Sequence, residues 1–263
     1  MNIKFSHSQL KSEVGIKFLP PTQEIYEVLV QAYAFFNEHL FENKLPNNCV
    51  ISIRACGRTA AYYSQNRFAN RESKAISHEI AFNPEYFGVT PIIETMQSLC
   101  HELCHMHQIL FGEPSRRSYH NREWADHMIS IGLMPSDTGA EGGKQTGQSM
   151  GDFPIPGGRF ELLCRELFKE GCYVRWYERI VSKKKMAEIK IDSEASEESQ
   201  DAGENILLTY VKQHGDEEEI ALIQQMTEVN LTEVEFQVVD KDANAGRVKF
   251  QCPNCKANIW AKP

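Results

Sequence analysis

One predicted helix limits the possible folds of this chain more than any other feature of its sequence. The helix opens at Thr90-Pro91, where Thr90 suits the N-cap and Pro91 the first helical position, and it runs to about Phe111. Between these boundaries lies SLCHELCHMHQ, residues 98–108, with three histidines, two cysteines and one glutamate. This many potential ligands on one helix predicts a metal site.

The spacing within the helix sorts these ligands. His101 and His105 are four residues apart in the pattern H-E-x-x-H, so they project from nearly the same face and can reach one ion. Glu102 lies about 100° further round the helix, beside such an ion, where a carboxylate can accept a proton from bound water. The remaining candidates point to other faces and are expected in the core or away from the metal: Cys100, Cys104 and His107.

A third ligand must come from outside this helix, because a catalytic zinc has three protein ligands and one open position. Residues 111–128 supply three candidates: His120, Glu123 and His127. His120 lies where a loop enters the next helix, so its side chain can point back across a cleft. Glu123 lies inside that helix, in an N-x-E-x-x-D pattern similar to that of metallopeptidases with a glutamate ligand. His127 is more typical of a helix face. The spacing alone leaves His120 and Glu123 both open.

The surrounding pattern is that of an α+β protein. Residues 22–43 repeat apolar side chains at helical spacing, with Thr22 as a candidate N-cap. Three short β-like runs follow, and more helices are expected beyond the metal-binding one. The predicted strands and later helices are Val50–Arg54, Ala60–Ser64, Ile76–Phe82, Asn121–Ile131 and Phe160–Glu170. This order predicts a small antiparallel sheet beside the helices.

Shifts in composition divide the chain into four parts. We expect a core over 1–137, a glycine-rich loop with a helical extension over 138–191, an acidic linker over 192–205 and a C-terminal segment over 206–263. The glycine-rich stretch 139–158 lacks the G-x-x-x-x-G-K-[ST] order of a phosphate-binding loop, so no nucleotide site is expected there.

The composition of the whole chain is that of a globular protein without a membrane anchor. Its 263 residues are 41% hydrophobic and 24% charged, with a net charge of −8, which argues against a surface that is basic throughout. The start has no apolar signal segment, and no apolar run approaches the roughly 18–20 residues of a membrane span. We therefore expect a cytoplasmic protein with no membrane partner, whose eight cysteines are reduced or bind metal.

The block HELCHMHQILFGEPSRRSYHNREWADHM, residues 101–128, resembles the SprT-like zinc metallopeptidases, which include the Spartan-type proteases of DNA–protein crosslink repair. AAYYS (60–64) and HEIAFNP (78–84) resemble the hairpin that precedes the zinc helix in that family. The resemblance covers about residues 22–135 and implies a zincin-like metallopeptidase core with Zn²⁺ as cofactor. The site residues that it implies are the metal ligands His101, His105 and His120 and the general base Glu102.

The C-terminal segment contains Cys252-Pro253-Asn254-Cys255, which resembles the first half of the zinc ribbon that often ends proteins of this family. A structural zinc site normally has four ligands, and no second cysteine pair follows in the sequence. We therefore expect an incomplete ribbon, in which Cys252 and Cys255 are weaker zinc ligands than the three histidines.

The resemblance implies a zinc-dependent endopeptidase whose partners are protein substrates, including proteins bound or crosslinked to DNA. The candidates for phosphate contacts are the basic residues Arg116, Arg117, Arg122 and Lys183–Lys185. The sequence does not identify the group that stabilises the oxyanion, for which the candidates are Tyr62, Tyr63, Tyr119 and Arg122. The alternative from another functional class is a non-proteolytic zinc protein that binds DNA or has a regulatory role.

Overall fold

The computed structural model describes residues 19–57, 59–116, 119–182, 206–228, 237–239, 248–251 and 258–261. Its helices are α1 (Pro21–Phe41), α2 (Ile92–Phe111), α3 (Arg122–Ile131), α4 (Arg159–Lys169), α6 (Ile206–His214) and α7 (Glu217–Thr227), with a 3-10 turn over Pro84–Tyr86. Its strands are β1 (Val50–Ile53), β2 (Ala61–Ala69), β3 (Ile76–Phe82), β4 (Leu133–Ser136), β5 (Gly151–Pro154), β6 (Ile180–Ser182), β7 (Gln237–Val239), β8 (Val248–Gln251) and β9 (Asn258–Ala261).

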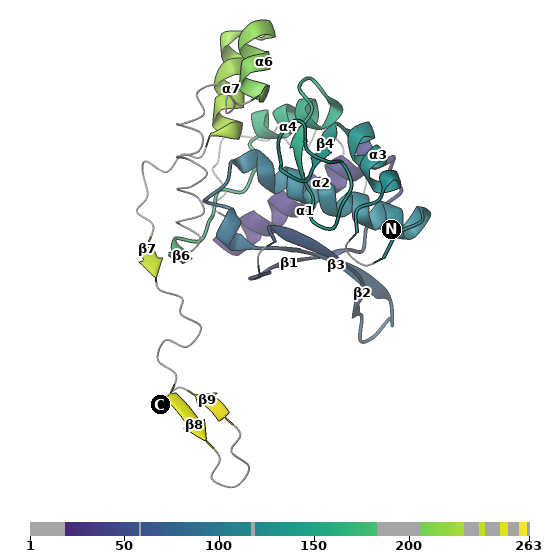
Figure 1. The fold of residues 1–263 in the computed structure, drawn as a ribbon, viewed down its shortest axis with the longest axis vertical. Coiled ribbons are helices and arrows are strands. Elements are labelled where there is room, and N and C mark those ends of the chain that lie inside the picture. Colours follow the sequence, from purple (N-terminus) through teal and green to yellow (C-terminus); the bar gives the residue numbers. More distant parts are fainter. Residues whose placement is uncertain are drawn as a thin grey trace.

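Helices α1 and α2 form the centre of the core because each has a continuous apolar face. Leu29, Ala32 and Phe36 of α1 are fully buried, as their helical spacing predicts. Met96 and Leu99 of α2 are buried as well. The three-stranded sheet lies on one side of these helices, and α3 and α4 lie on the other (Figure 1). The metal-binding helix predicted from the sequence is thus held between two layers.

The start of α1 differs from the prediction. The helix begins at Pro21, and its N-cap is Pro20, which makes no side-chain capping hydrogen bond. Thr22 lies inside the first turn, so its predicted role as N-cap is wrong. The cause is local: the residue before a proline is driven to extended backbone, and this fixes the boundary of the helix at Pro20.

The end of α2 is as predicted and its start is not. Gly112 is the C-cap, but the helix begins at Ile92 with Pro91 as the N-cap residue. The hydroxyl of Thr90 donates to the carbonyl of Tyr86 at 3.0 Å. The side chain of Thr90 therefore stabilises the preceding 3-10 turn and does not cap α2.

The central sheet is mixed, which corrects the predicted antiparallel sheet. Its strand order is β1-β3-β2, with β2 antiparallel and β1 parallel to β3. The central position of β3 agrees with its burial, since five of its seven residues are buried. The three strands occur where the sequence predicts them, but the direction of pairing depends on how the connections cross the sheet. Local alternation of side chains carries no information about that direction.

Strand β2 extends well beyond the predicted Ser64 and forms a long hairpin with β3. Pairing continues to Ala69 after a shift of register between Ser64 and Phe68. All residues from 65 to 76 are exposed, and this half of the hairpin projects from the body of the molecule (Figure 1). The exposed side chains of this half form a surface that other molecules can reach.

Part of the glycine-rich stretch is regular structure. Residues 151–154 form β5, which pairs antiparallel with β4 immediately after α3. Several predicted features lie outside the described residues: Arg117, Lys183–Lys185, the linker 192–205, Cys252 and Cys255. The antiparallel strands β8 and β9 flank the two cysteines in sequence. No helix in the described part of the chain is long and apolar enough to cross a membrane.

Candidate metal centre

His101 and His105 of α2 direct their imidazole rings to the same side of the helix. His101 and His105 are one helical turn apart, and their ring centroids are 5.0 Å apart. The helix keeps them at the boundary of the core, because Met96, Leu99 and Leu103 are fully buried while the two imidazoles are only half-buried. Cys100 and Cys104 lie among the fully buried side chains, as predicted.

His120 brings the third imidazole to the same place. It directly precedes α3, whose N-cap Asn121 accepts a hydrogen bond from the amide of Trp124 at 3.0 Å. The Nε2 atom of His120 lies 3.3 Å from Nε2 of His101 and 3.1 Å from Nε2 of His105. One nitrogen from each of the three rings lies within 4.8 Å of the others.

The hydrogen bonds of two of these rings show that their inner nitrogens are free to bind a cation. Nδ1 of His101 donates to the carboxylate of Asp152 at 3.0 Å, and Nδ1 of His120 donates to the carbonyl of Gly147 at 3.2 Å. In the neutral rings, the facing Nε2 atoms are therefore both lone-pair acceptors. Zinc–nitrogen bonds of about 2.0–2.1 Å at tetrahedral angles place two ligand nitrogens about 3.3–3.4 Å apart. The two separations to His120 are compatible with one metal ion bound at this point.

The protonation of the three imidazoles agrees with a cation site. Burial, and after it the charge of His101, lowers the pKa of His105 to about 2 and that of His120 to about 4. Burial also opposes the charged form of His101, but the hydrogen bond to Asp152 and the charges of Glu102 and Asp152 outweigh it and raise the pKa of His101. Two rings are thus neutral at neutral pH, which is the form that binds metal. The raised pKa of His101 shows that a positive charge is favoured at this ring.

Asp152 and Gly147 are functional residues that the sequence did not identify. Asp152 also accepts from Nε2 of Gln97 at 3.3 Å, and the backbones of Gly147 and His120 form an isolated antiparallel bridge. The segment from Gly147 to Asp152 therefore holds two of the three imidazoles by their outer nitrogens, which fixes ring orientation and tautomer. An aspartate in a glycine-rich stretch gives no local signal of contact with a histidine 51 residues earlier.

The indole of Trp124 packs against all three imidazoles. The sequence did not identify this residue. Its ring centroid lies 4.9 Å from that of His101, 5.4 Å from that of His105 and 4.4 Å from that of His120. The indole is completely buried. A rigid ring in contact with all three imidazoles limits their rotation, so Trp124 positions the ligands by packing.

Glu102 follows His101 on α2, and the charge of that imidazole acts on its carboxyl group. Its side chain is buried, and burial raises the pKa of the carboxyl group, while the charge of His101 and a hydrogen bond from the amide of Tyr63 partly offset that effect. These surroundings therefore favour the protonated form of the carboxyl group more than water does. The contact with Tyr63 also ties α2 to strand β2.

The alternative third ligands point elsewhere. The carboxylate of Glu123 accepts from Nε2 of Gln108 at 2.7 Å and from the amide of Glu113 at 2.9 Å, so it stabilises the loop after α2. His127 stacks on His107, with ring centroids 4.2 Å apart. Both histidines lie outside the cluster of three, as expected from their positions on the helices.

The proposed oxyanion groups are engaged in other contacts. The hydroxyl of Tyr62 donates to Glu79 at 3.4 Å, and that of Tyr63 bonds to Nδ1 of His78 at 2.8 Å. Arg122 pairs with Asp126 at 2.7 Å, and the ring of Tyr119 lies under the guanidinium of Arg116. These four contacts are all with residues outside the imidazole cluster.

Comparisons with known proteins agree with this geometry. Residues 29–142 match the model of the SprT-like family. An uncharacterized protein encoded in the mucB 3′ region of Salmonella typhimurium is 48% identical over 60 residues, which is 23% of this chain and 80% of that protein. No solved structure matches the chain at a significant level. The matched region contains the three imidazoles and the glutamate between the first two, and the chain belongs to the SprT-like family.

Proposed function

We propose that this chain is a zinc-dependent endopeptidase with His101, His105 and His120 as metal ligands and Glu102 as general base. One observation carries the proposal: a nitrogen from each of the three imidazoles lies within 4.8 Å of the other two. Three protein ligands with a fourth position left open are typical of a catalytic zinc. Membership in the SprT-like family supports the same function.

The chemistry is divided between the ion and the chain. A zinc ion held by His101, His105 and His120 would lower the pKa of a water molecule and polarise the peptide carbonyl. Glu102 takes the proton of the water and later gives it to the departing amine. The raised pKa of this carboxyl group suits both steps, because a group that titrates closer to neutral pH can both hold and release the proton. Asp152 keeps the imidazole of His101 in the tautomer that presents Nε2.

The free edge of β2 is the place where the main chain of a substrate can bind. Among the described strands, β2 pairs with β3 on one side only, and the amide of Tyr63 in β2 donates to Glu102. Extended peptides add to such edges through main-chain hydrogen bonds. A peptide bound there passes the catalytic carboxylate, so the site favours extended segments over folded domains.

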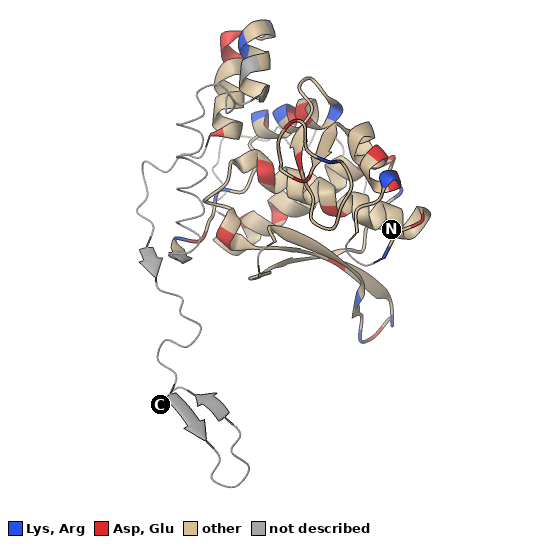
Figure 2. Cartoon of the chain, in the orientation of Figure 1, with Lys and Arg blue, Asp and Glu red and all other residues tan. Residues whose placement is uncertain are grey.

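The substrates that we infer are proteins bound or crosslinked to DNA. The exposed half of the β2–β3 hairpin carries Arg67, Arg71 and Lys74 against one acidic residue, Glu72 (Figure 2). Side chains of this kind bind phosphates in a salt-dependent way. Arg67 lies four residues from Tyr63, which is about 13 Å along a strand. A hairpin bound to DNA would therefore keep the catalytic site close to the attached protein.

Two assays test this proposal. The zinc-loaded chain is incubated with an unfolded protein and with a DNA-crosslinked protein, before and after a chelator removes the metal. We expect cleavage of both substrates that stops on chelation and returns with zinc, and faster cleavage of the crosslinked protein. Zinc retention and DNA binding without cleavage of either substrate would contradict the proposal and favour the non-proteolytic alternative.

A further inference from the structure

Strand β2 contains a bulge just beyond the residue that contacts Glu102. Its pairing with β3 is regular up to Ser64 and resumes at Phe68 after a shift of register. Over that shift β2 advances four residues and β3 only two, so β2 carries extra residues in the bulge. One of them, Asn66, has a left-handed backbone with φ of +53°. The bulge thus begins next to Tyr63, whose amide donates to Glu102.

One imidazole, that of His78 in β3, contacts β2 on both sides of the start of this bulge. Its Nδ1 atom lies 2.8 Å from the hydroxyl oxygen of Tyr63 and accepts from the amide of Asn66 at 3.4 Å. Because an amide nitrogen only donates, Nδ1 carries no proton, and the hydroxyl of Tyr63 donates to it as well. Burial lowers the pKa of His78, which favours this neutral ring. The imidazole therefore joins the regular part of β2 to the bulge.

The two contacts lie on the inner face of the sheet. Tyr63 pairs with Ile80, which is fully buried, and His78 is two residues before Ile80 and so points to the same face. His78 is 8% exposed, and its ring centroid lies 5.7 Å from that of Tyr63. Asn66 has no partner in the register of β2 and β3, so the imidazole supplies the acceptor that its amide would otherwise lack.

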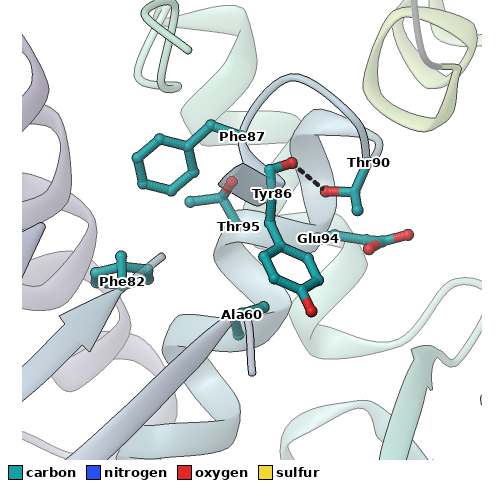
Figure 3. A pocket seen from close by; sticks show the side chains of 8 residues that line it. Ala60, Phe82, Tyr86, Phe87, Thr90, Glu94 and Thr95 are labelled. Atoms are coloured by element: carbon teal, nitrogen blue, oxygen red, sulfur yellow. Dashed lines mark hydrogen bonds between the residues drawn. The ribbon is translucent and has the colours of Figure 1, made fainter. Parts of the chain in front are cut away.

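The start of β2 is held without any contribution from His78. The amide of Asn83, just after β3, donates to the carbonyl of Ala60 at 2.8 Å. Ala60 and Thr95 line the same small hollow between the start of β2 and the first turn of α2 (Figure 3). The strand is thus fixed before Tyr63 by its contacts with the core, and beyond Tyr63 by His78.

We propose that His78 is a positioning residue for Glu102 and acts through Tyr63. The inference rests on the proposed peptidase function. By binding the hydroxyl of Tyr63 and the amide of Asn66, His78 fixes the segment of β2 whose amide donates to the carboxylate of Glu102. A reacting group misplaced by about 1 Å can lose about 100-fold in rate. His78 lies outside the cluster of three imidazoles, so its replacement should leave the metal in place.

The test compares two variants of the zinc-loaded chain that place a hydrogen-bond acceptor differently. In His78→Asn the side-chain oxygen takes the place of Nδ1, whereas the longer side chain of His78→Gln carries its amide group past that place, to about the position of Nε2. We expect His78→Gln to lower kcat for an unfolded protein about tenfold, with KM and zinc content as in the wild type. His78→Asn should keep most of the wild-type rate.

Hydrogen exchange of the same proteins, followed by NMR, gives a readout that does not depend on cleavage. The amides of Tyr63 and Asn66 should exchange about tenfold faster in His78→Gln than in the wild type, and at about the wild-type rate in His78→Asn. Tyr63→Phe removes the hydroxyl and leaves the contact of Asn66 in place. It should lower kcat and accelerate exchange at position 63 alone.

Tyr33→Phe is the matched control, because Tyr33 is a buried tyrosine whose hydroxyl donates to the carbonyl of Pro46 at 2.6 Å. It should lower the melting temperature and change neither kcat nor the exchange of the Tyr63 amide. Tyr63→Phe decides the test if His78→Gln does not fold.

Wild-type kcat values in folded His78→Gln and Tyr63→Phe would overturn the positioning role and leave the peptidase function intact. Equal losses of kcat in His78→Asn and His78→Gln would overturn it too, because only one of these variants keeps the acceptor. A lack of zinc-dependent cleavage by the wild type would overturn both the positioning role and the peptidase function.

Discussion

A few residues around the three imidazoles hold these rings in place. Asp152 binds His101 and Gly147 binds His120, while Trp124 packs against all three rings. These contacts orient the ligands before any ion binds, so less ordering is needed on binding. At the scale of residues, the site is thus determined as much by what surrounds the ligands as by the ligands themselves.

Removing the charge of Asp152 should weaken metal binding. We expect Asp152→Asn to raise the dissociation constant for zinc about tenfold and Asp152→Ala to raise it about 100-fold, because the alanine variant also loses the hydrogen bond to His101. Competition with a chelating dye measures these constants. Asp126→Asn is the control, since Asp126 is an exposed acid that pairs with Arg122. Equal zinc affinities of all four proteins would show that Asp152 does not position the ligand.

His127 should make the folded state sensitive to acid. Burial, followed by the charges of His107 and Lys44, lowers the pKa of His127 to about 4. In the unfolded chain a histidine titrates near about 6.5, so between these values the unfolded state binds the extra proton. The free energy of unfolding should therefore fall as the pH falls through this window, and be unaffected by this group above it.

The substitution His127→Phe keeps an aromatic ring against Phe41 and removes the titration. Between about pH 7 and about pH 5 the variant should lose less stability than the wild type, by on the order of 1–2 kcal/mol, after allowance for the partial exposure of the ring. Urea denaturation at the two pH values measures the difference. The exposed His39 provides a control in His39→Gln, and equal losses in wild type and His127→Phe would contradict the assignment.

At the scale of elements, the order of segments around α2 builds the site. α2 supplies two imidazoles and the carboxylate, the entrance of α3 supplies the third imidazole, and the 147–152 segment secures two of the rings. The chain must turn sharply between α3 and β4 for this segment to return to α2. Gly132 makes that turn, with φ of +97°.

Gly132→Ala should therefore destabilise the fold. A Cβ atom at Gly132 would lie 2.8 Å from the amide nitrogen of Phe160 and 2.9 Å from that of Arg159. With the left-handed backbone added to this clash, we expect a loss of about 2–3 kcal/mol in the free energy of unfolding. Gly139 also has a positive φ, but no atom lies within 4 Å of its Cβ position. Gly139→Ala should cost about 1 kcal/mol, and equal costs for the two variants would exclude the close approach as a cause.

The helices were largely predictable from the sequence, and the connections between them were not. The boundaries of α3 follow from Asn121 and Gly132, which are local signals, and the structure confirms them. The parallel pairing of β1 with β3 and the contact of Asp152 with His101 join segments far apart in the chain, and no local pattern encodes them. The four-part division of the chain stays a prediction, as does zinc binding by Cys252 and Cys255.

At the scale of the whole molecule, metal binding and folding should be coupled. The three ligands come from α2 and from the entrance of α3, so a bound ion links elements that are separate in the unfolded chain. Zinc at about 100 times its dissociation constant should add about 2.7 kcal/mol of stability, which raises the melting temperature by roughly 5–11 °C for a chain of this size.

Thermal denaturation with and without zinc measures this shift. His120→Ala should abolish most of it, whereas the double substitution Cys252→Ser and Cys255→Ser should leave it in place. A shift that survives in His120→Ala and disappears in the cysteine variant would place the stabilising ion at the C-terminal segment instead.

We propose that Glu102 performs proton transfer at a zinc held by the three imidazoles, and the turnover of Glu102→Gln at matched zinc occupancy tests this role. Because Glu102 is not among the three ligands, we expect the variant to bind as much zinc as the wild type. Loss of the general base should reduce cleavage of an unfolded protein at least about 100-fold. Cleavage at the wild-type rate by the zinc-loaded variant would contradict the account.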